Sequence, residues 1–125
     1  MLNLDRTDVG DADLKELAGM SQLEGLHVAG THVTSDGLVA LSGLTNLVEL
    51  TLSDNDIDDR ATSHLRGLNK LKHLHLGRTR ITNAGLEPLK GLTSLTYLNL
   101  RDTGATQQGA TALVNGNPNL YIAYR

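Results

Sequence analysis

The sequence contains no cysteine, no phenylalanine and no tryptophan, and its only aromatic residues are three tyrosines. Without cysteine, the chain can form no disulfide framework and can carry out no thiolate chemistry. Without large aromatic side chains, the core must be filled by small and medium aliphatic side chains stacked in layers, as repeat proteins do. The length of 125 residues is that of one domain.

Long hydrophobic runs are also missing, since none approaches the roughly 20 residues that cross a membrane. The N-terminal segment, MLNLDRTD, has neither the basic stretch nor the long apolar stretch of a secretory signal. The sequence therefore predicts a cytoplasmic protein, provided that it is not an excised fragment of a longer chain.

The net charge of −3 conceals an uneven distribution. Residues 1–59 contain 12 acidic and 2 basic residues, a balance of −10, whereas residues 60–125 contain 2 acidic and 9 basic residues, a balance of +7. In a repeat protein, sequence order is spatial order, so one end is expected to be negative and the other positive. This favours head-to-tail contact between copies, unless the acidic end faces a neighbour in a longer parent chain.

A pattern of leucines recurs every 24 residues. Its clearest unit is residues 71–94, LKHLHLGRTRITNAGLEPLKGLTS, and it returns at residues 23–46, 47–70 and 95–118. Residues 1–22 form a partial repeat that lacks its opening positions, and residues 119–125 contain only the opening ones. A fixed period of this length is the signature of a repeat architecture. We therefore predict one domain over residues 1–125, built as a solenoid.

The first half of each repeat has the pattern of a short strand. Positions are numbered from the first leucine of each full repeat, which is Leu23, Leu47, Leu71 or Leu95. Positions 1, 4 and 6 are apolar, as in Leu71, Leu74 and Leu76, whereas positions 3, 5 and 7 are mostly polar. This two-residue alternation predicts a strand with one buried face.

The second half of each repeat has the pattern of a short helix. Positions 12 and 13 hold residues that start helices, such as Thr82 and Asn83, and their side chains are expected to accept from the amides of the following turn. Leucine recurs at positions 16, 19 and 22, the spacing of one helical face. Pro88 predicts that the helix around it is short or irregular. Glycine at position 21 is expected to end each helix with a positive φ, at Gly19, Gly43, Gly67 and Gly91.

These positions resemble the leucine-rich repeat family, through the pattern L-x-x-L-x-L-x-x-T-x-[VI]-T-x-x-G-L-x-x-L-x-G-L over essentially the whole chain. The resemblance implies an α/β fold, a right-handed solenoid with a parallel sheet on its concave side and short helices on its convex side. The VT-x-x-GL segment is similar to bacterial repeats, to ribonuclease-inhibitor-like proteins and to substrate subunits of ubiquitin ligases.

The family usually has asparagine or cysteine at position 9, where the side chain binds the turn backbone. Here a ladder of threonine hydroxyls is expected to make these hydrogen bonds, with one asparagine among them, at Thr7, Thr31, Asn55, Thr79 and Thr103.

The two ends differ from the central repeats. Residues 115–118, NGNP, are typical of a turn and predict the end of the last full repeat. Ile122 and Tyr124 align with inward positions, so residues 119–125 are predicted to add a closing strand. At the other end, Leu2 and Leu4 begin in the middle of a strand and leave an open sheet edge. Either the chain was cut from a longer protein or another copy covers this edge.

The candidate binding surface consists of the outward side chains of successive strands on the concave side. Tyrosine, arginine and histidine bury area at modest entropic cost and form hydrogen bonds, as interface anchors do. The sequence therefore predicts a non-enzymatic module that binds a protein partner, with no cofactor and no metal. The alternative interpretation is that these residues have no binding role and are polar only because any outward face of a solenoid is polar. The predicted partner-binding residues are His73, His75, Tyr97, Asn99 and Arg101 in one patch, with Glu49, His27 and Arg78 as further contacts.

Other functions stay open. The chain can be the recognition segment of a larger bacterial effector or ubiquitin-ligase-type receptor whose active domain is missing. A small metal-dependent hydrolase would use His73 and His75 with Glu49 as a third ligand, but the two histidines are about 7 Å apart on one strand face, which is wide for chelation. A hydrolase using Ser53, His75 and Asp54 is disfavoured because the carboxylate is expected to point toward the rim.

Nucleic-acid binding is not predicted. The basic residues of the C-terminal half are spread around the coil, and no basic stripe meets aromatic residues beyond Tyr97 and Arg101.

Overall fold

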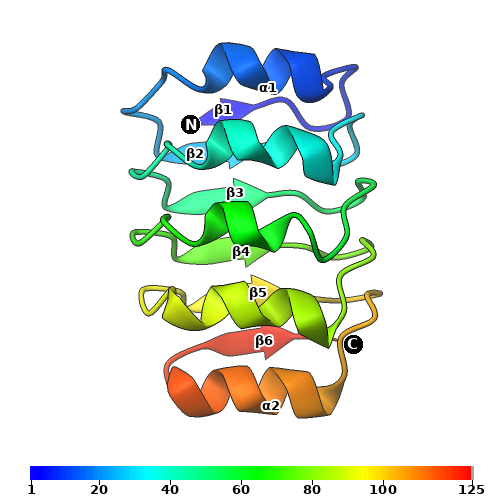
Figure 1. The fold of residues 1–125 in the computed structure, drawn as a ribbon, viewed down its shortest axis with the longest axis vertical. Helices are drawn as coiled ribbons and strands as arrows, with labels where there is room; N and C mark the ends of the chain where they lie inside the picture. Colours follow the sequence, from blue (N-terminus) through cyan, green and yellow to red (C-terminus); the bar gives the residue numbers. More distant parts are fainter. Residues whose placement is uncertain (125) are drawn as a thin grey trace.

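The computed structural model describes residues 1–124, which form one parallel sheet with short helices on one side of it (Figure 1). Each strand of the sheet is followed in space by the next strand of the chain. The strands within the described chain are β1 (Leu2–Asn3), β2 (Gly25–His27), β3 (Glu49–Thr51), β4 (His73–His75), β5 (Tyr97–Asn99) and β6 (Tyr121–Ala123). The helices are α1 (Asp11–Leu17), α2 (Gln107–Gly116) and three 3₁₀ segments, η1 (Ser35–Leu41), η2 (Thr62–Leu65) and η3 (Asn83–Gly91).

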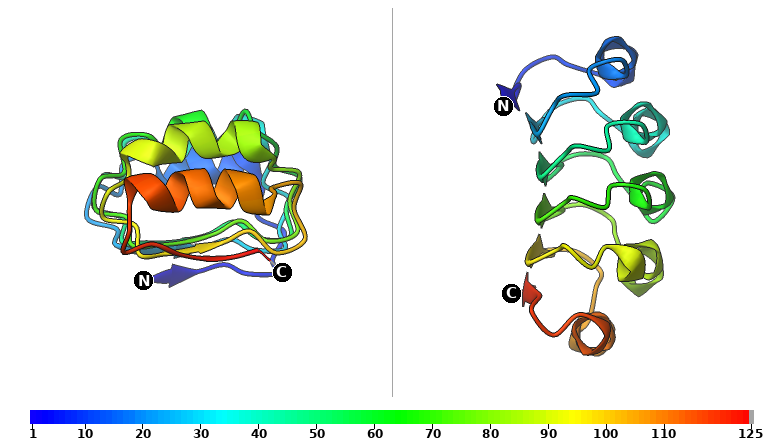
Figure 2. Two further views of the ribbon diagram at one scale, coloured as in Figure 1. Left: turned by 90° about the horizontal axis from the view of Figure 1, so that it is seen from below. Right: turned by 90° about the vertical axis from the view of Figure 1, so that its left-hand side faces the viewer.

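The register of the sheet repeats the period of the sequence. Leu26 pairs with Leu50, Leu50 with Leu74, and Leu74 with Leu98, each 24 residues further along the chain. Ile122 pairs with Leu98 and completes the predicted closing strand, although Arg125, its last predicted residue, lies outside the described residues. The strands line the inner side of a shallow arc and the helices line its outer side (Figure 2). The predicted solenoid with a concave parallel sheet is confirmed.

The core lies between the sheet and the helices and consists of aliphatic side chains. The predicted inward residues Leu71, Leu74 and Leu76 are fully buried, as are their equivalents in neighbouring turns. Each fully buried leucine contributes about 1.5–3 kcal/mol from the removal of apolar surface from water. Ile122 and Tyr124 pack against the same core from its C-terminal end. Stacked leucines thus replace the phenylalanines and tryptophans that the sequence lacks.

The hydroxyl ladder at position 9 is confirmed. In Thr79, Oγ1 donates to the carbonyl oxygen of Leu76 at 2.7 Å, and the other threonines of the column bind their own turns in the same way. Asn55 does more, because its Nδ2 donates both to Leu52 of its own turn, at 3.1 Å, and to Val28 of the preceding turn, at 2.8 Å. The longer amide therefore links two turns, and the hydroxyl of Thr31 also reaches the next turn, where it donates to Oδ1 of Asn55 at 3.2 Å.

The side chains at position 13 do not cap their own helices, which corrects the sequence prediction. Asp59 instead accepts from both the backbone N and Oγ1 of Thr82 in the next turn. Asn83 likewise accepts from the backbone N of Thr106 at 2.9 Å. Of these two positions, position 12 is the one that caps locally, as where Thr82 accepts from Ala84 at 3.3 Å. Position 13 therefore holds successive turns together on the helix side.

Small residues at position 15 make room for these links. A Cβ added to Gly85 would lie 2.4 Å from Oδ1 of Asp59, and one added to Gly109 would lie 2.1 Å from Oδ1 of Asn83. Where the linking residue is the shorter Ser35, the residue at position 15 is Ala61 instead. The size of each linking side chain thus matches the space left by the residue 26 positions later.

The predicted positive φ at position 21 is wrong. Among the described glycines, only Gly30 has a positive φ, of 64°. The left-handed residues belong to position 8, in the turn that follows each strand, because the chain bends there from the sheet toward the helix side. The non-glycine residues with positive φ are Arg6, Asp54, Arg78 and Asp102. The irregularity expected around Pro88 is confirmed, since it lies inside the 3₁₀ segment η3.

Candidate functional site

The sheet register brings the predicted residues of the concave face side by side. Glu49 pairs with His73, and His73 pairs with Tyr97, so these outward side chains form one row across three strands. His75 pairs with Asn99 in a second row, and the same register relates His27 to Thr51 and Thr51 to His75. Residues that share a repeat position are therefore neighbours in space, about 4.8 Å apart from strand to strand.

Toward the N-terminal end, this face is charged. Glu49 lies between two histidines, with Oε2 2.5 Å from Nε2 of His27 and Oε1 3.6 Å from Nδ1 of His73. The other ring nitrogen of His27, Nδ1, lies 3.8 Å from Oδ2 of Asp5. These four residues form a chain of polar contacts across the first four strands, and Glu49 is held by its neighbours.

Toward the C-terminal end, the face is aromatic. The ring centroids of His75 and Tyr97 are 5.3 Å apart with a tilt of 45°, and those of Tyr97 and Tyr121 are 5.8 Å apart with planes 18° from parallel. We call His75, Tyr97 and Tyr121 the aromatic row. The site prediction omitted Tyr121, although its alignment with Tyr97 at position 3 of the repeat was a sufficient signal. Tyr121 is 62% exposed, so the row ends in an open ring.

The structure separates the two histidines of β4, which the sequence prediction had treated as a pair. His73 turns toward Glu49, whereas His75 turns toward Tyr97. Partial burial lowers the pKa of His75 below its usual value, and the nearby charge of Glu49 only partly opposes this effect. His75 therefore favours the neutral form, which suits a ring packed against a tyrosine.

Arg78 and Asp54 form an ion pair at the rim. Nη2 of Arg78 donates to Oδ2 of Asp54 at 2.8 Å, and Nε of the same guanidinium donates to Oδ1. Arg6 adds a longer contact, 3.5 Å from Nη2 to Oδ2. The hydrogen bond from Arg78 lowers the pKa of Asp54, and the same bond raises the pKa of Arg78. The charge of Arg78 is thus already matched within the protein.

Asn99 and Arg101 lie at the C-terminal end of β5. Oδ1 of Asn99 accepts from the backbone N of Arg101 at 3.0 Å, which fixes the orientation of the amide. Asn99 is half-buried, while Arg101 is exposed. All eight predicted residues therefore lie on the concave face or its rim. They fall into a charged group, an aromatic group and a third set at the ends of the strands, which consists of Arg78, Asn99 and Arg101.

The arrangements required for the hydrolase alternatives are not assembled within residues 1–124. Oγ of Ser53 has no hydrogen-bond partner there, so it is not bonded to His75, and the carboxylate of Asp54 binds Arg78 instead. That part of the chain also contains no group of three or more histidine, cysteine, aspartate or glutamate residues placed to hold a metal ion. The structure offers no support for hydrolysis by either route.

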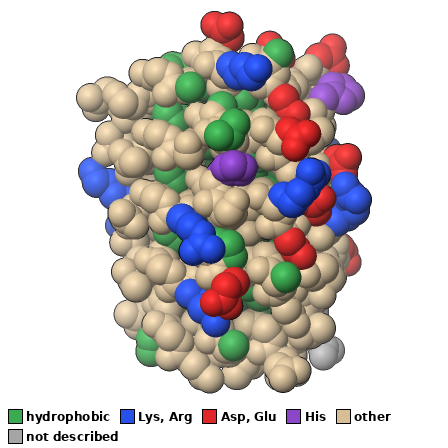
Figure 3. All heavy atoms as spheres, viewed as in Figure 1, with side chains coloured by type: hydrophobic (Ala, Val, Ile, Leu, Met, Phe, Trp, Pro, Cys, Tyr) green, Lys and Arg blue, Asp and Glu red, His purple; other side chains and the backbone are tan. Residues whose placement is uncertain are grey.

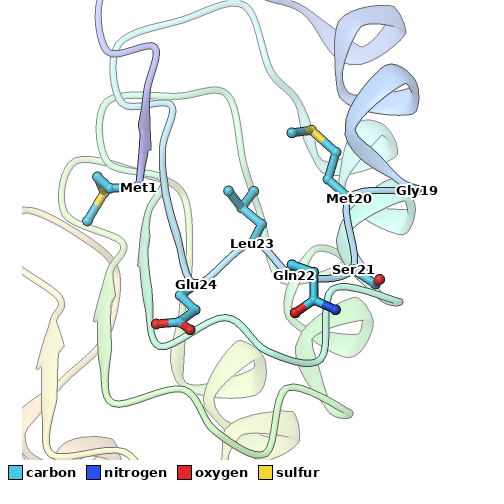
Figure 4. A pocket seen from close by; sticks show the side chains of 7 residues that line it. All are labelled: Met1, Gly19, Met20, Ser21, Gln22, Leu23 and Glu24. Atoms are coloured by element: carbon cyan, nitrogen blue, oxygen red, sulfur yellow. The ribbon is translucent and has the colours of Figure 1, made fainter.

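A cavity lies away from this face, at the N-terminal end of the solenoid (Figure 4). Its volume is about 550 Å³. The side chain of Met1 also covers Gly25, where an added Cβ would lie 2.6 Å from Cε of Met1. The cavity is separate from the aromatic row. It is lined by Met1, Gly19, Met20, Ser21, Gln22, Leu23 and Glu24.

The opposite, helix-side face has a different character. Its hydrophobic side chains appear only in small, separate spots among polar and charged ones (Figure 3). No helix within residues 1–124 has the length and hydropathy needed to span a membrane.

Comparisons with known proteins agree with this geometry. Residues 45–104 match the family model described as Leucine rich repeat. A leucine-rich repeat protein of Leptospira interrogans has a similar structure, with a TM-score of 0.70 and 22% sequence identity. An internalin of Listeria monocytogenes is also similar, with a TM-score of 0.55 and 24% identity. No curated protein matches the chain.

The fold and the repeated strand pattern define a leucine-rich-repeat solenoid. Residues 45–104 match the leucine-rich repeat family, and the flanking turns continue the same strand register. The similarity covers 88% of this chain but 27% of the Leptospira chain, and 87% of this chain but 36% of the internalin chain. The chain thus spans about a quarter to a third of the length of these two structures.

Proposed function

We propose that the chain is a non-enzymatic module that binds a segment of a protein partner on the concave face of its sheet. One observation carries this proposal, namely the aromatic row, which ends in the exposed ring of Tyr121. Aromatic side chains supply large contact areas at low entropic cost and dominate binding energy at interfaces. The helix-side face, with its scattered hydrophobic spots, has no comparable feature (Figure 3).

The rows of this face suit an extended or loop-like partner segment. Three rings lie on consecutive strands, so they offer a continuous surface across the direction of the strands. The charged group around Glu49 extends this surface toward the N-terminal end. The proposed anchors are Tyr97, Tyr121 and His75, with His73, Asn99, Arg101, Glu49, His27 and Arg78 around them.

A selection experiment tests this proposal. A random peptide library is selected on the wild-type protein, and the enriched peptides are then screened against Tyr97→Ala and against Val39→Ala. Val39 is an exposed residue of η1 on the helix side, so its variant is a matched control. We expect peptides that lose binding to Tyr97→Ala and keep it with Val39→Ala. Enriched peptides that bind both variants equally would contradict the proposal.

A second candidate is that the chain is the recognition segment of a larger protein whose active part lies elsewhere. Its support is that the chain spans only 27% and 36% of two similar structures. The length of the parent reading frame tests it, because this candidate expects further coding sequence and a single short frame contradicts it. A cytoplasmic location stays a prediction of the sequence.

We also retain head-to-tail self-association as a proposal. Within the described residues, β1 pairs with β2 only, and the cavity beside it is lined by Met20 and Leu23. The opposite charges of the two halves favour such contact at low salt. Light scattering over a range of protein and salt concentrations tests it, since a constant mass of one chain rules it out.

A further inference from the structure

Beside the aromatic row, the ridge of side chains that follows the strands is interrupted at Gly77. Ser53, Gly77 and Arg101 occupy the same place in successive turns, because their carbonyl oxygens accept equivalent hydrogen bonds of 2.8–3.0 Å from Gly30, Asp54 and Arg78. Neighbouring strands are about 4.8 Å apart, so Ser53 and Arg101 flank Gly77 with roughly 10 Å between their backbones. The missing side chain of Gly77 therefore leaves a gap between them.

This gap is a pocket of about 220 Å³, here called the Ser53 pocket. Gly77 forms its floor, and its φ is not positive, so the backbone does not require glycine there. The space favours glycine, because an added Cβ would lie 3.2 Å from Nδ2 of Asn99 and 3.3 Å from the carbonyl oxygen of Arg101, which is closer than usual. The pocket is lined by Ser53, Gly77, Arg78, Asn99, Arg101 and Asp102.

The hydroxyl of Ser53 is the one buried side-chain polar atom in residues 1–124 that has no hydrogen-bond partner. A buried hydroxyl without a partner costs free energy, and buried polar groups in native proteins are nearly always paired. Since Ser53 lines the pocket, a ligand bound there would supply the missing partner. The pocket thus contains a hydroxyl that can pair with a ligand group.

The other groups around the pocket are mainly hydrogen-bond donors. Because Oδ1 of Asn99 accepts from the backbone of Arg101, Nδ2 is left as a donor, and it lies above Gly77. The guanidinium-bearing residues Arg78 and Arg101 line the same pocket. Donors of this kind are suited to a ligand that presents oxygen acceptors.

The balance of charges around the pocket favours a singly charged acceptor over a doubly charged one. Arg78 is matched by Asp54, with which it forms the rim ion pair, and the carboxylate of Asp102 lies beside Arg101 in sequence. No excess of positive charge remains for a doubly charged phosphate group. A carboxylate has two acceptor oxygens and a single charge, and a guanidinium and an amide are its usual partners.

We propose that the Ser53 pocket binds the side-chain carboxylate of an aspartate or glutamate in the partner segment, an assignment that rests on the function proposed above. The pocket and Tyr97 share β5, where Asn99 is two residues after Tyr97 on the same face. A segment lying across the aromatic row therefore reaches the pocket with an adjacent residue. The pocket selects for an acidic residue, while the rings supply contact area.

Titration of the ¹⁵N-labelled protein with N-acetylglutamate methylamide, followed by NMR, tests the assignment directly. N-acetylglutamine methylamide is the neutral control of the same shape. We expect shifts at the amides of Ser53, Gly77 and Arg78 that saturate with the glutamate compound and are absent with the glutamine one. Shifts that grow linearly without saturation, or that are equal for both compounds, overturn it, as does tighter binding of inorganic phosphate.

Two variants locate the binding. Ser53→Ala removes the orphaned hydroxyl, so we expect at least a fivefold weaker affinity for the glutamate compound, with an unfolding midpoint that is unchanged or higher. Gly77→Leu fills the pocket and abolishes the saturable shifts. Ser63→Ala is the control, since Ser63 Oγ donates to the carbonyl of Arg60 on the other side of the molecule. Equal affinity for wild type and Ser53→Ala overturns the assignment even if Gly77→Leu fails to fold.

The outcome is distinguishable from that of the proposed function. Selected peptides that depend on Tyr97 but tolerate replacement of every acidic residue by its amide would support the concave surface and refute the acidic-residue assignment. Saturable glutamate binding without any peptide that depends on Tyr97 would support the pocket and refute the proposed function.

Discussion

The ring of Tyr97 stacks on the ring of Tyr121, with centroids 5.8 Å apart and planes 18° from parallel. The two residues are 24 positions apart and pair directly between β5 and β6. The register of the solenoid therefore builds an aromatic surface from residues that are distant in sequence. This aromatic surface lies on the concave face of the sheet, whereas the core behind the sheet contains no phenylalanine or tryptophan.

The links between successive turns predict a coupled pair of substitutions. Gly85→Ala should lower the free energy of unfolding by about 1–3 kcal/mol, because the new Cβ would meet the carboxylate of Asp59 and overpack the site. Asp59→Ser should reduce this cost, since the chain already combines serine and alanine at Ser35 and Ala61. Urea unfolding of both single variants and the double variant measures the coupling. Simple additivity of the two effects would refute the size match.

Replacing Asp59 also tests the hydrogen bonds themselves. Asp59→Ala removes the acceptor for the backbone N and Oγ1 of Thr82 and should cost about 1–3 kcal/mol. Asp59→Asn should keep most of the stability, because Asn83 makes the equivalent link to Thr106. Thermal unfolding of the two variants provides the comparison, and equal losses would mean that the link is not made by a side-chain oxygen.

The glycines that end the helices should tolerate alanine. Gly43 and Gly91 have no positive φ, and a Cβ added there would meet nothing within 4 Å. Gly43→Ala and Gly91→Ala should therefore each stabilise the protein by about 0.4–1 kcal/mol, through a less flexible unfolded chain.

Gly30→Ala is the matched control, for which we expect a loss of stability. The denaturant midpoints of the three variants are compared. Gly30 has a φ of 64°, and its new Cβ would lie 2.6 Å from Nη1 of Arg6. A left-handed alanine costs about 1–2 kcal/mol, so this variant should be destabilised. If all three variants lost stability, the role predicted from the sequence for the helix-ending glycines would be restored.

The partial burial of His75 should make the free energy of unfolding depend on pH. Its pKa in the folded protein is below the ordinary value of 6.5 because burial disfavours the charged ring. Between the folded pKa and 6.5, the unfolded chain therefore binds more protons, and the free energy of unfolding rises with pH in this window. Above it, this contribution is constant.

Urea unfolding of the wild type and of His75→Gln from pH 5 to pH 7.5 isolates this effect. The contacts of Glu49 with His27 and His73 are present in both proteins, so the difference between the two profiles reports on His75. We expect the wild type to lose more stability than the variant as the pH falls. Parallel profiles would show that burial does not disfavour the protonated ring.

Much of the fold follows from the sequence because two periods act together. The two-residue alternation assigns each strand residue to a face, and the 24-residue period sets the register, so the pairing of Glu49 with His73 and of His73 with Tyr97 was predictable. The contacts that each side chain makes with its neighbours on this face were not predictable. His73 turns to Glu49 and His75 to Tyr97 through side-chain rotation, which the strand pattern does not determine.

Other features were missed although the sequence carries a signal for them. The pairing of Asp59 with Gly85, and of Ser35 with Ala61, is visible as a match of sizes at a spacing of 26 residues. The left-handed position after each strand has a weaker signal, because only Gly30 in that column is glycine while Arg6 and Arg78 are not. General preferences for glycine at helix ends gave the wrong location for the positive φ.

The most direct test of the central claim is the affinity of a selected peptide for the wild type and for Tyr97→Ala, measured by calorimetry with Val39→Ala as the control. The loss of a ring at the centre of the aromatic row should cost about 1–3 kcal/mol of binding free energy, which raises the Kd roughly 5- to 150-fold. Val39→Ala should leave the Kd unchanged. An unchanged Kd for Tyr97→Ala, with intact folding, would contradict the account and move the binding surface away from the concave face.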